Sequence, residues 1–122
     1  MNAMLLARAT AAGRVGFGVA LLLTPLPLTG AWLGDDAHST GSQVLARALG
    51  MRDLVLGAGA LTSNGEDLPR WLLAGAAADA TDLVATLRAA DLPQRGRILT
   101  AAAATAGLAL GLGAVIGLRQ DH

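Results

Sequence analysis

Hydrophobic and polar positions alternate in long blocks along this chain. Four apolar stretches are separated by short polar segments, and they cover residues 3–24, 42–62, 69–90 and 98–118. About 20 apolar residues are enough for an α-helix to cross the hydrocarbon core of a bilayer. The clearest stretch runs from Ile98 to Leu118, which contains no charged residue and is flanked by Arg97 and Arg119. The pattern therefore predicts four transmembrane helices.

The segments between these stretches contain helix-breaking and turn residues. Pro25 and Pro27 follow the first stretch, and proline disfavours continuation of a helix. We expect a loop from Pro27 to Gly41 and a turn at Asn64-Gly65. Short connections make consecutive helices antiparallel neighbours. The predicted fold is all-α, a single domain of residues 1–122 with four transmembrane helices in an antiparallel up-down bundle.

The first stretch also resembles a signal peptide, because basic residues precede an apolar run. Three further apolar stretches follow it, so we expect a retained helix. Orientation in the membrane is weakly determined, since arginines are nearly balanced between the two ends. One end carries Arg8, Arg70 and Arg119, and the other carries Arg88, Arg95 and Arg97. The first loop is acidic and lacks basic residues, which favours a cytoplasmic N-terminus.

Composition supports a location in the cell (inner) membrane. Hydrophobic residues make up 53% of the chain and charged residues only 15%, against about 25% in soluble domains. The formal net charge is zero and no basic patch is present, so no nucleic-acid partner is expected. Cysteine is absent, which excludes disulfides and thiolate metal sites. His38 and His122 lie outside the predicted helices, so we expect neither haem nor another cofactor.

Charged residues nevertheless occur within the apolar stretches. There are three arginines and three aspartates, namely Arg14, Arg47, Arg52, Asp53, Asp79 and Asp82. Charges in hydrocarbon usually face the bundle interior, where they pair or form a functional site. Their formal sum is zero, as a buried ionic cluster requires. These six residues are the candidate ligand-binding residues of the chain.

Helix geometry predicts which of these charges meet. If the second and third helices are antiparallel, Arg52 lies at the depth of Asp79, and Arg47 at the depth of Asp82. Asp79 and Asp82 are three residues apart and share one helix face. Arg14 lies near the centre of the first helix and could join the layer together with Asp53.

Two interpretations of this layer remain open. It could be a structural clamp that fixes helix register, or a polar pocket that holds a ligand and moves protons. Pairing without a cavity would favour the clamp, whereas a cavity at that depth would favour a ligand site. Asp79 and Asp82 also match a spacing found in Mg²⁺-dependent lipid-phosphate enzymes. No second acidic motif accompanies them, so no metal site is expected.

Glycines predict close helix packing. Gly50 and Gly57 share a helix face with Asp53, which would let another backbone approach. The last stretch contains two GxxxG steps, formed by Gly107, Gly111, Gly113 and Gly117. They indicate packing either within the chain or against a second copy or another membrane protein.

Most of the chain resembles a known family. Its pattern is Arg47, Gly50, Arg52, Asp53 and Gly57, followed by Trp71, Asp79 and Asp82. This pattern resembles small uncharacterised integral membrane proteins of high-GC Gram-positive bacteria, which form a family defined by a domain of unknown function. The resemblance implies a four-helix membrane protein and no particular activity.

The sequence favours a small integral membrane protein with a structural or partner-binding role. Its partners would be the lipid bilayer and a second copy or another membrane protein, and no catalytic residue is assigned. The alternative is a membrane-embedded enzyme, isomerase- or cyclase-like, or a carrier for a lipophilic small molecule. Asp79, Asp82 and Asp53 would then be the acid–base candidates, and Arg47 and Arg52 would orient the substrate. A weaker hypothesis is a subunit of a transporter or redox complex.

Overall fold

A computed structural model describes residues 2–121; His122 lies outside the described residues. The helices are α1 (Ala3–Leu23), α2 (Pro25–Leu33), the 3₁₀-helix η1 (Gly34–His38), α3 (Thr40–Thr62), α4 (Asp67–Arg88) and α5 (Gln94–Gln120). Within this described part of the chain there is no β-strand. The predicted all-α class is confirmed, and the four long helices begin and end within a few residues of the predicted bounds.

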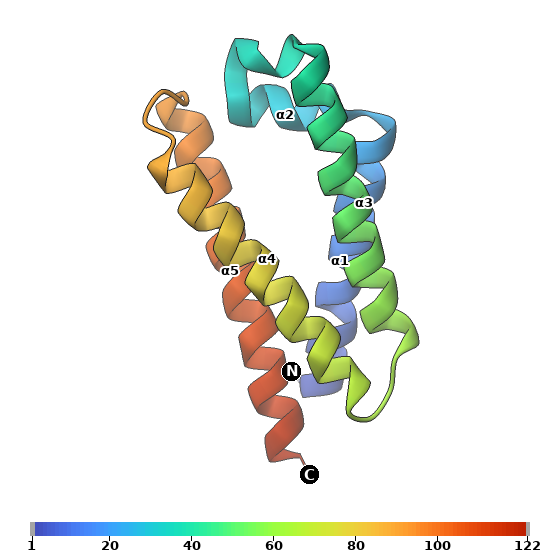
Figure 1. Ribbon diagram of the computed structural model, residues 1–122. Coiled ribbons are helices and arrows are strands. Elements are labelled where there is room, and N and C mark those ends of the chain that lie inside the picture. The colour runs from blue at the N-terminus through green and yellow to red at the C-terminus, as the bar shows by residue number, and fades with distance from the viewer. Residues whose placement is uncertain (1, 122) are drawn as a thin grey trace.

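The four long helices run alternately in opposite directions (Figure 1). Both chain ends lie at the same end of the molecule as the α3–α4 connection, and α2 crosses the opposite end. The helices form two close pairs, α1 with α3 and α4 with α5. The pairs meet near the chain termini and diverge toward α2 (Figure 1). This divergence positions the candidate site described below.

The predicted loop from Pro27 to Gly41 is wrong. Its first part forms α2, and η1 follows directly. Proline lacks an N–H group, so it ends a helix, but it suits the first position of the next one. Pro25 occupies that first position in α2. Gly34 ends α2 with a positive φ of 66°, and the Ser39 side chain caps α3 by accepting a hydrogen bond from Ser42 N.

Small residues bring α1 and α3 into backbone contact. A Cβ atom on Gly18 would lie 2.6 Å from the carbonyl oxygen of Gly50, and one on Gly57 would lie 2.7 Å from that of Ala11. Both distances are too short for a side chain, so glycine is required at this interface. The predicted close approach at Gly50 and Gly57 is therefore confirmed, and the approaching backbone is that of α1.

Three of the four glycines in the two GxxxG steps of α5 pack within the chain. Gly107 and Gly111 face α4, and Gly117 packs against Ala3 of α1. Gly113 is exposed, and a Cβ atom there would meet no heavy atom within 4 Å. The two GxxxG steps thus serve packing inside the chain, apart from Gly113.

An apolar core fills the end of the molecule near the chain termini. Its buried side chains come from all four long helices and are Ala7, Ala11, Ala60, Leu68, Leu72, Ala114, Val115 and Leu118. Arg8 fastens the same end, because its guanidinium donates to the carbonyl oxygens of Ala60, Leu61 and Ser63 at the end of α3. These carbonyls have no partner within the helix. This end of the molecule is therefore closed.

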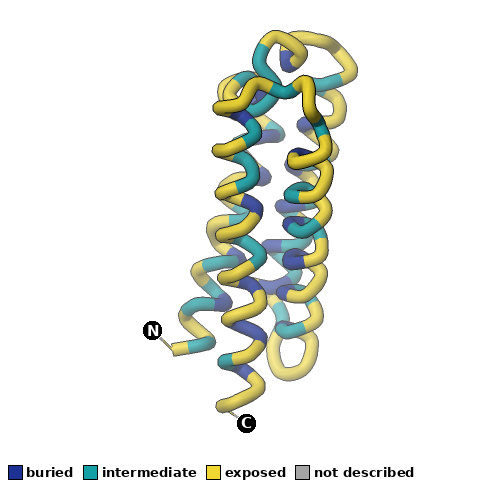
Figure 2. Tube along the Cα trace, turned by 90° about the vertical axis from the view of Figure 1, so that its left-hand side faces the viewer, coloured by how far each residue is buried: buried dark blue, intermediate teal, exposed yellow. Residues whose placement is uncertain are grey.

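The outward faces of the helices are exposed and apolar. Buried positions lie on the inward sides, and exposed positions cover the outside (Figure 2). Leu23, Leu45 and Ile98 are large hydrophobic residues that are at least 60% exposed. Two helices, α1 and α5, are long and apolar enough to cross a membrane.

Candidate functional site

Arg14, near the middle of α1, connects three helices. Its Nη1 atom donates to Oδ1 of Asp53 on α3 at 3.1 Å. Its Nη2 atom donates to Oδ2 of Asp79 at 2.5 Å and to the carbonyl oxygen of Gly75 at 3.3 Å, both on α4. The Arg14, Asp53 and Asp79 side chains are only 13%, 5% and 11% exposed. Arg14 therefore joins the two helix pairs through buried ionic contacts.

Arg52 on α3 makes the second connection to α4. Its Nη1 and Nη2 atoms donate to Oδ1 and Oδ2 of Asp82 at 3.0 and 2.7 Å. This is the bidentate geometry that an arginine and a carboxylate favour. Arg52 also donates to Oδ1 of Asp53 at 3.2 Å, so one carboxylate oxygen accepts from both arginines. We refer to Arg14, Arg52, Asp53, Asp79 and Asp82 as the Arg/Asp cluster.

The cluster contains five of the six predicted residues, but the predicted pairs are wrong. Asp79 binds Arg14 rather than Arg52, and Asp82 binds Arg52 rather than Arg47. Arg47 is exposed and forms no ion pair with residues 2–121. Two residues at equal depth lie at the same level of the bundle, but their side chains can point in different directions around their helices. With 3.6 residues per turn, Arg47 points roughly 140° away from Arg52 around α3.

Losing Arg47 changes the charge of the layer. The cluster holds two arginines and three aspartates. Its formal charge is therefore −1, whereas the sequence predicted a sum of zero.

Two glycines make room for the cluster. Gly75 lies under the Arg14 guanidinium, and a Cβ there would be 3.1 Å from Nη2. On α5, a Cβ at Gly107 would lie 2.5 Å from Oδ2 of Asp79. The carboxylate therefore rests directly against the α5 backbone. A larger residue at position 107 would displace it.

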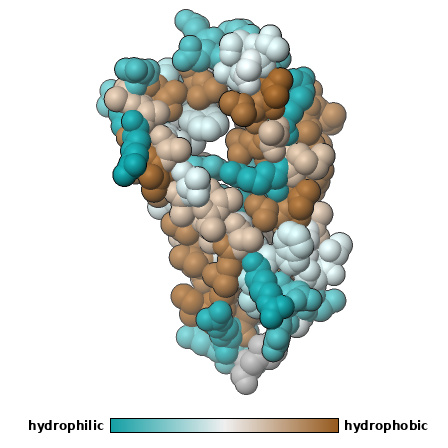
Figure 3. Space-filling view, viewed as in Figure 1, coloured by the Kyte–Doolittle hydropathy of each residue, from teal (hydrophilic) through white to brown (hydrophobic). Residues whose placement is uncertain are grey.

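A cavity of about 660 Å³ lies between the helix pairs, beside the cluster. Arg14, Asp53, Asp79 and Asp82 form its polar wall, and most of the remaining lining is apolar. The walls consist of Leu6, Ala9, Thr10, Gly13, Phe17 and Leu21 from α1, Leu28, Thr29, Ala31 and Trp32 from α2, Leu49 from α3, and Leu99, Thr100, Ala103, Ala104, Gly107 and Leu110 from α5. Figure 3 shows a hollow in the molecular surface next to a strip of hydrophilic atoms.

The cavity is open on the side of α3 and α4, where Figure 3 shows the hollow, and it also has an opening between α1 and α5. Phe17, Leu99 and Leu110 line it and are between 44% and 50% exposed, so they border an opening. Toward the chain termini the two helices close, since Gly117 packs against Ala3. The opening between these two helices is thus surrounded by their apolar outer surfaces.

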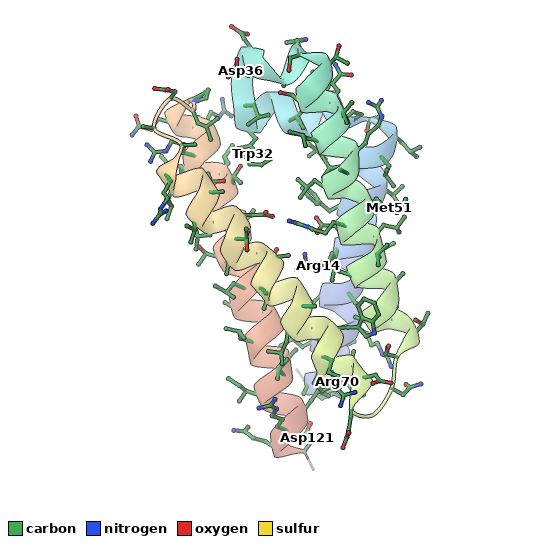
Figure 4. All side chains as sticks on the ribbon, viewed as in Figure 1. Arg14, Trp32, Asp36, Met51, Arg70 and Asp121 are labelled. Atoms are coloured by element: carbon green, nitrogen blue, oxygen red, sulfur yellow. The ribbon has the colours of Figure 1, made fainter. Side chains whose placement is uncertain are left out.

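Two hydrogen-bonding groups in the cavity wall lack partners. Trp32 Nε1 and Thr10 Oγ1 are buried and bond to no residue between 2 and 121. In Figure 4, Trp32 lies below α2, and Arg14 lies between α1 and α4. An unsatisfied buried polar group costs about 1–3 kcal/mol, and such groups often mark functional sites.

The geometry narrows the chemical roles that the sequence allowed. Arg47 is outside the site, and both carboxylate oxygens of Asp82 accept from Arg52. Asp53 Oδ2 and Asp79 Oδ1 accept no hydrogen bond from residues 2–121. The oxygens open to a bound molecule are therefore those of Asp53 and Asp79.

Sequence analysis did not identify the apolar lining as part of a site. Trp32 was expected only within a loop, and Phe17, Leu99 and Leu110 only as parts of apolar helices. The lining positions of α1 are 6, 9, 10, 13, 14, 17 and 21, and they share one face of the helix. That spacing identifies a shared face without saying whether it is packed or open.

No family model matches the chain, and neither a curated protein nor a solved structure matches it. The resemblance to the membrane protein family described above stays a prediction.

Proposed function

We propose that this chain is a small multi-pass membrane protein that binds an amphiphilic molecule. α1, α3, α4 and α5 would span the bilayer as an up-down bundle, and the molecule would enter from the lipid between α1 and α5. The observation that carries the proposal is the cavity of about 660 Å³, which joins apolar walls to a buried ionic cluster. Ligand sites typically combine a mainly apolar lining with a few polar groups.

Helix lengths and charge positions support the membrane location. The four long helices contain 21, 23, 22 and 27 residues, which correspond to roughly 30–40 Å at 1.5 Å per residue. The hydrocarbon core is about 30 Å thick. Four of the charges in α3 and α4 belong to the inward-facing cluster. Arg47 lies in the second turn of α3, where its long side chain can reach the headgroup region.

An amphiphile fits the cavity better than a pure hydrocarbon. The apolar walls match a hydrocarbon body, and the free carboxylate oxygens of Asp53 and Asp79 match a polar end. Each such contact removes the cost of an unsatisfied polar group.

The Arg/Asp cluster would have two roles: it would hold the helices together and form the polar wall of the cavity. Ion pairs within it bridge the two helix pairs, so the clamp that the sequence suggested is part of the proposal. Binding is favoured over catalysis, because each aspartate is already engaged by an arginine. In the enzymatic alternative, Asp53 and Asp79 are the acid–base candidates that keep a free oxygen.

Orientation and assembly complete the proposal. The N-terminus would be cytoplasmic, because the connection at the α2 end is acidic between α1 and α3. A second copy or another membrane protein would contact α5 on the side of Gly113, since the other three glycines of the GxxxG steps pack internally. The resemblance to a four-helix membrane family is consistent with this arrangement.

Photolabelling with a diazirine-bearing fatty alcohol, which is uncharged and can donate to the free carboxylate oxygens, tests the binding proposal. In vesicles that contain the purified protein, we expect cross-links at cavity-lining residues such as Thr29 and Thr100. Gly13→Phe should reduce them strongly, because Gly13 lines the cavity and has open space beside it. Gly16→Phe is the matched control, since Gly16 also has open space and lies outside the cavity lining.

Mass spectrometry of the labelled peptides distinguishes the outcomes. Cross-links at the lining residues that disappear in Gly13→Phe and persist in Gly16→Phe would support the proposal. Labelling confined to outward residues such as Val44 and Val55 would contradict it.

A further inference from the structure

We infer that the cavity selects lipophilic monocations, because its ionic wall carries one uncompensated negative charge beside apolar and aromatic surfaces. This inference rests on the proposed function and names the chemical class that the cavity would bind. Such a molecule has an apolar body and one positive group, for example a substituted amine or a quaternary ammonium.

The Arg/Asp cluster carries one more negative charge than positive charges. Arg14 and Arg52 face Asp53, Asp79 and Asp82, which leaves a formal charge of −1. The parts of α2 and α5 that line the cavity contribute no charged side chain. Arg47 points away and is exposed. A buried charge without a counter-charge is strongly unfavourable, so one bound positive charge completes this site.

Hydrogen-bonding capacity points the same way. The terminal nitrogens of Arg14 and Arg52 already donate to carboxylates. Arg14 Nε and one Nη1 hydrogen donate to no residue between 2 and 121, so some donor capacity remains in the cluster. Oδ2 of Asp53 and Oδ1 of Asp79 remain free to accept from, or attract, a cationic group. The cluster thus offers two free carboxylate oxygens, and its net negative charge favours a positive group beside them.

The walls favour an organic cation over a metal ion. The described residues contain no group of three side chains that could hold a metal together. Phe17 and Trp32 line the cavity, and aromatic rings attract cations through their π faces. The remaining lining is mostly aliphatic and suits hydrocarbon substituents. An inorganic ion would lose its hydration there without equivalent ligands.

A proton would compete with the ligand for the same charge. The groups that face the cavity are Arg14 from α1, Asp53 from α3, and Asp79 and Asp82 from α4, with Arg52 behind them. Protonation of one aspartate would bring the cluster to zero. Cation binding should therefore weaken as the pH falls.

Two hydrophobic ions of opposite charge provide a direct test. Tetraphenylphosphonium and tetraphenylborate share a size and shape and differ in the sign of their charge. Binding is measured by isothermal titration calorimetry with the purified protein in micelles, against protein-free micelles. We expect about tenfold tighter binding of the cation. Asp79→Asn should remove that preference, since it keeps an acceptor and removes the excess charge.

Asp36→Asn is the control variant, because it changes the protein's net charge by the same amount at an exposed position outside the cluster and the cavity lining. It should retain the preference for tetraphenylphosphonium. If Asp79→Asn does not fold, the pH dependence of the unmodified protein supplies the second readout. A preference that is unchanged between pH 8 and pH 5 would contradict the inference.

The outcomes separate this inference from the proposed function. Equal binding of both ions, or tighter binding of tetraphenylborate, would overturn the cation preference. If cross-links of the uncharged fatty alcohol still map to the cavity, the proposed function stands in that case. Absence of both ion binding and cavity cross-links would overturn both.

Discussion

Arg14 is the residue on which the two helix pairs most depend. It donates to Asp53 on α3 and to Asp79 on α4, and all three side chains are largely buried. A buried ion pair adds little net stability compared with apolar packing, but removing one partner leaves the other charge uncompensated. Arg14 is therefore important because its removal would leave the Asp53 and Asp79 carboxylates with less compensating positive charge.

Replacing Arg14 by glutamine should destabilise the protein strongly. We expect Arg14→Gln to lower the free energy of unfolding by about 3–5 kcal/mol. Arg47→Gln is the matched control and should change it by less than about 0.5 kcal/mol, because Arg47 is exposed. Denaturant titration in detergent micelles measures both values.

A double variant checks the cause. Combining Arg14→Gln with Asp79→Asn should cost less than the sum of the two single substitutions, since each removes the same ion pair. Additive losses would show that Arg14 acts through packing alone.

At the residue scale, sequence reasoning identified most of the cluster and missed its pairing. Five of the six predicted charges meet, because charges in apolar helices turn toward one another. The pairing depends on the direction of each side chain around its helix, and Arg47 shows the consequence. The close contacts of Gly107 with Asp79 depend on the neighbouring helix and were not predictable.

At the scale of the element, α5 has two differently used faces. Gly107 lies against the Asp79 carboxylate, whereas Gly113 has open space beside it. Glycine is therefore needed for close packing at position 107, whereas position 113 has room for a side chain.

Alanine substitutions should separate these faces. Gly107→Ala should destabilise the protein by about 1–3 kcal/mol, because its methyl group would displace the Asp79 carboxylate. Gly113→Ala should be neutral or stabilising by up to about 1 kcal/mol, since alanine favours the helix. Thermal unfolding in micelles compares them. Loss of dimer in Gly113→Ala, seen by cross-linking, would instead assign that face to a partner.

The long helices were predictable because their apolar stretches are long and their ends carry proline, glycine or capping residues. α2 was missed for a local reason. Pro25 both ends α1 and begins α2. The sequence contains no separate residue that indicates the start of a new helix.

At the scale of the whole molecule, the helices pack closely at the end near the chain termini, and the two helix pairs diverge at the α2 end. The apolar core and Arg8 close the end near the chain termini, and the cavity lies where the helix pairs diverge. The sequence allowed two interpretations of the charged layer, one of them a polar pocket, and did not decide between them. Helix periodicity shows which face points inward, but the angle between two helix pairs depends on contacts along their full length.

Cysteine accessibility tests the proposed four-pass topology, and the chain contains no native cysteine. Asp36→Cys lies at the α2 end and should react with a membrane-impermeant maleimide added outside intact cells. Glu66→Cys lies at the opposite end, in the α3–α4 connection, and should react only after permeabilisation. Labelling is read by a mass shift on a gel.

Reversed labelling would invert the proposed orientation and keep four spans. Labelling of both cysteines in intact cells would contradict four spanning helices.

If the chain is inserted into a membrane as proposed, the shared carboxylate of Asp53 also has a consequence for its biogenesis. Arg14 and Asp79 are 65 positions apart, whereas Asp53 comes between them in the chain. During insertion into a membrane, Arg14 would meet Asp53 first, when α3 leaves the translocon. A single charge in mid-membrane costs about 2.5–3.5 kcal/mol on insertion scales, and this early contact would offset part of it. The charge of Arg14 would then be partly neutralised in the hairpin of α1 and α3 before α4 is synthesised.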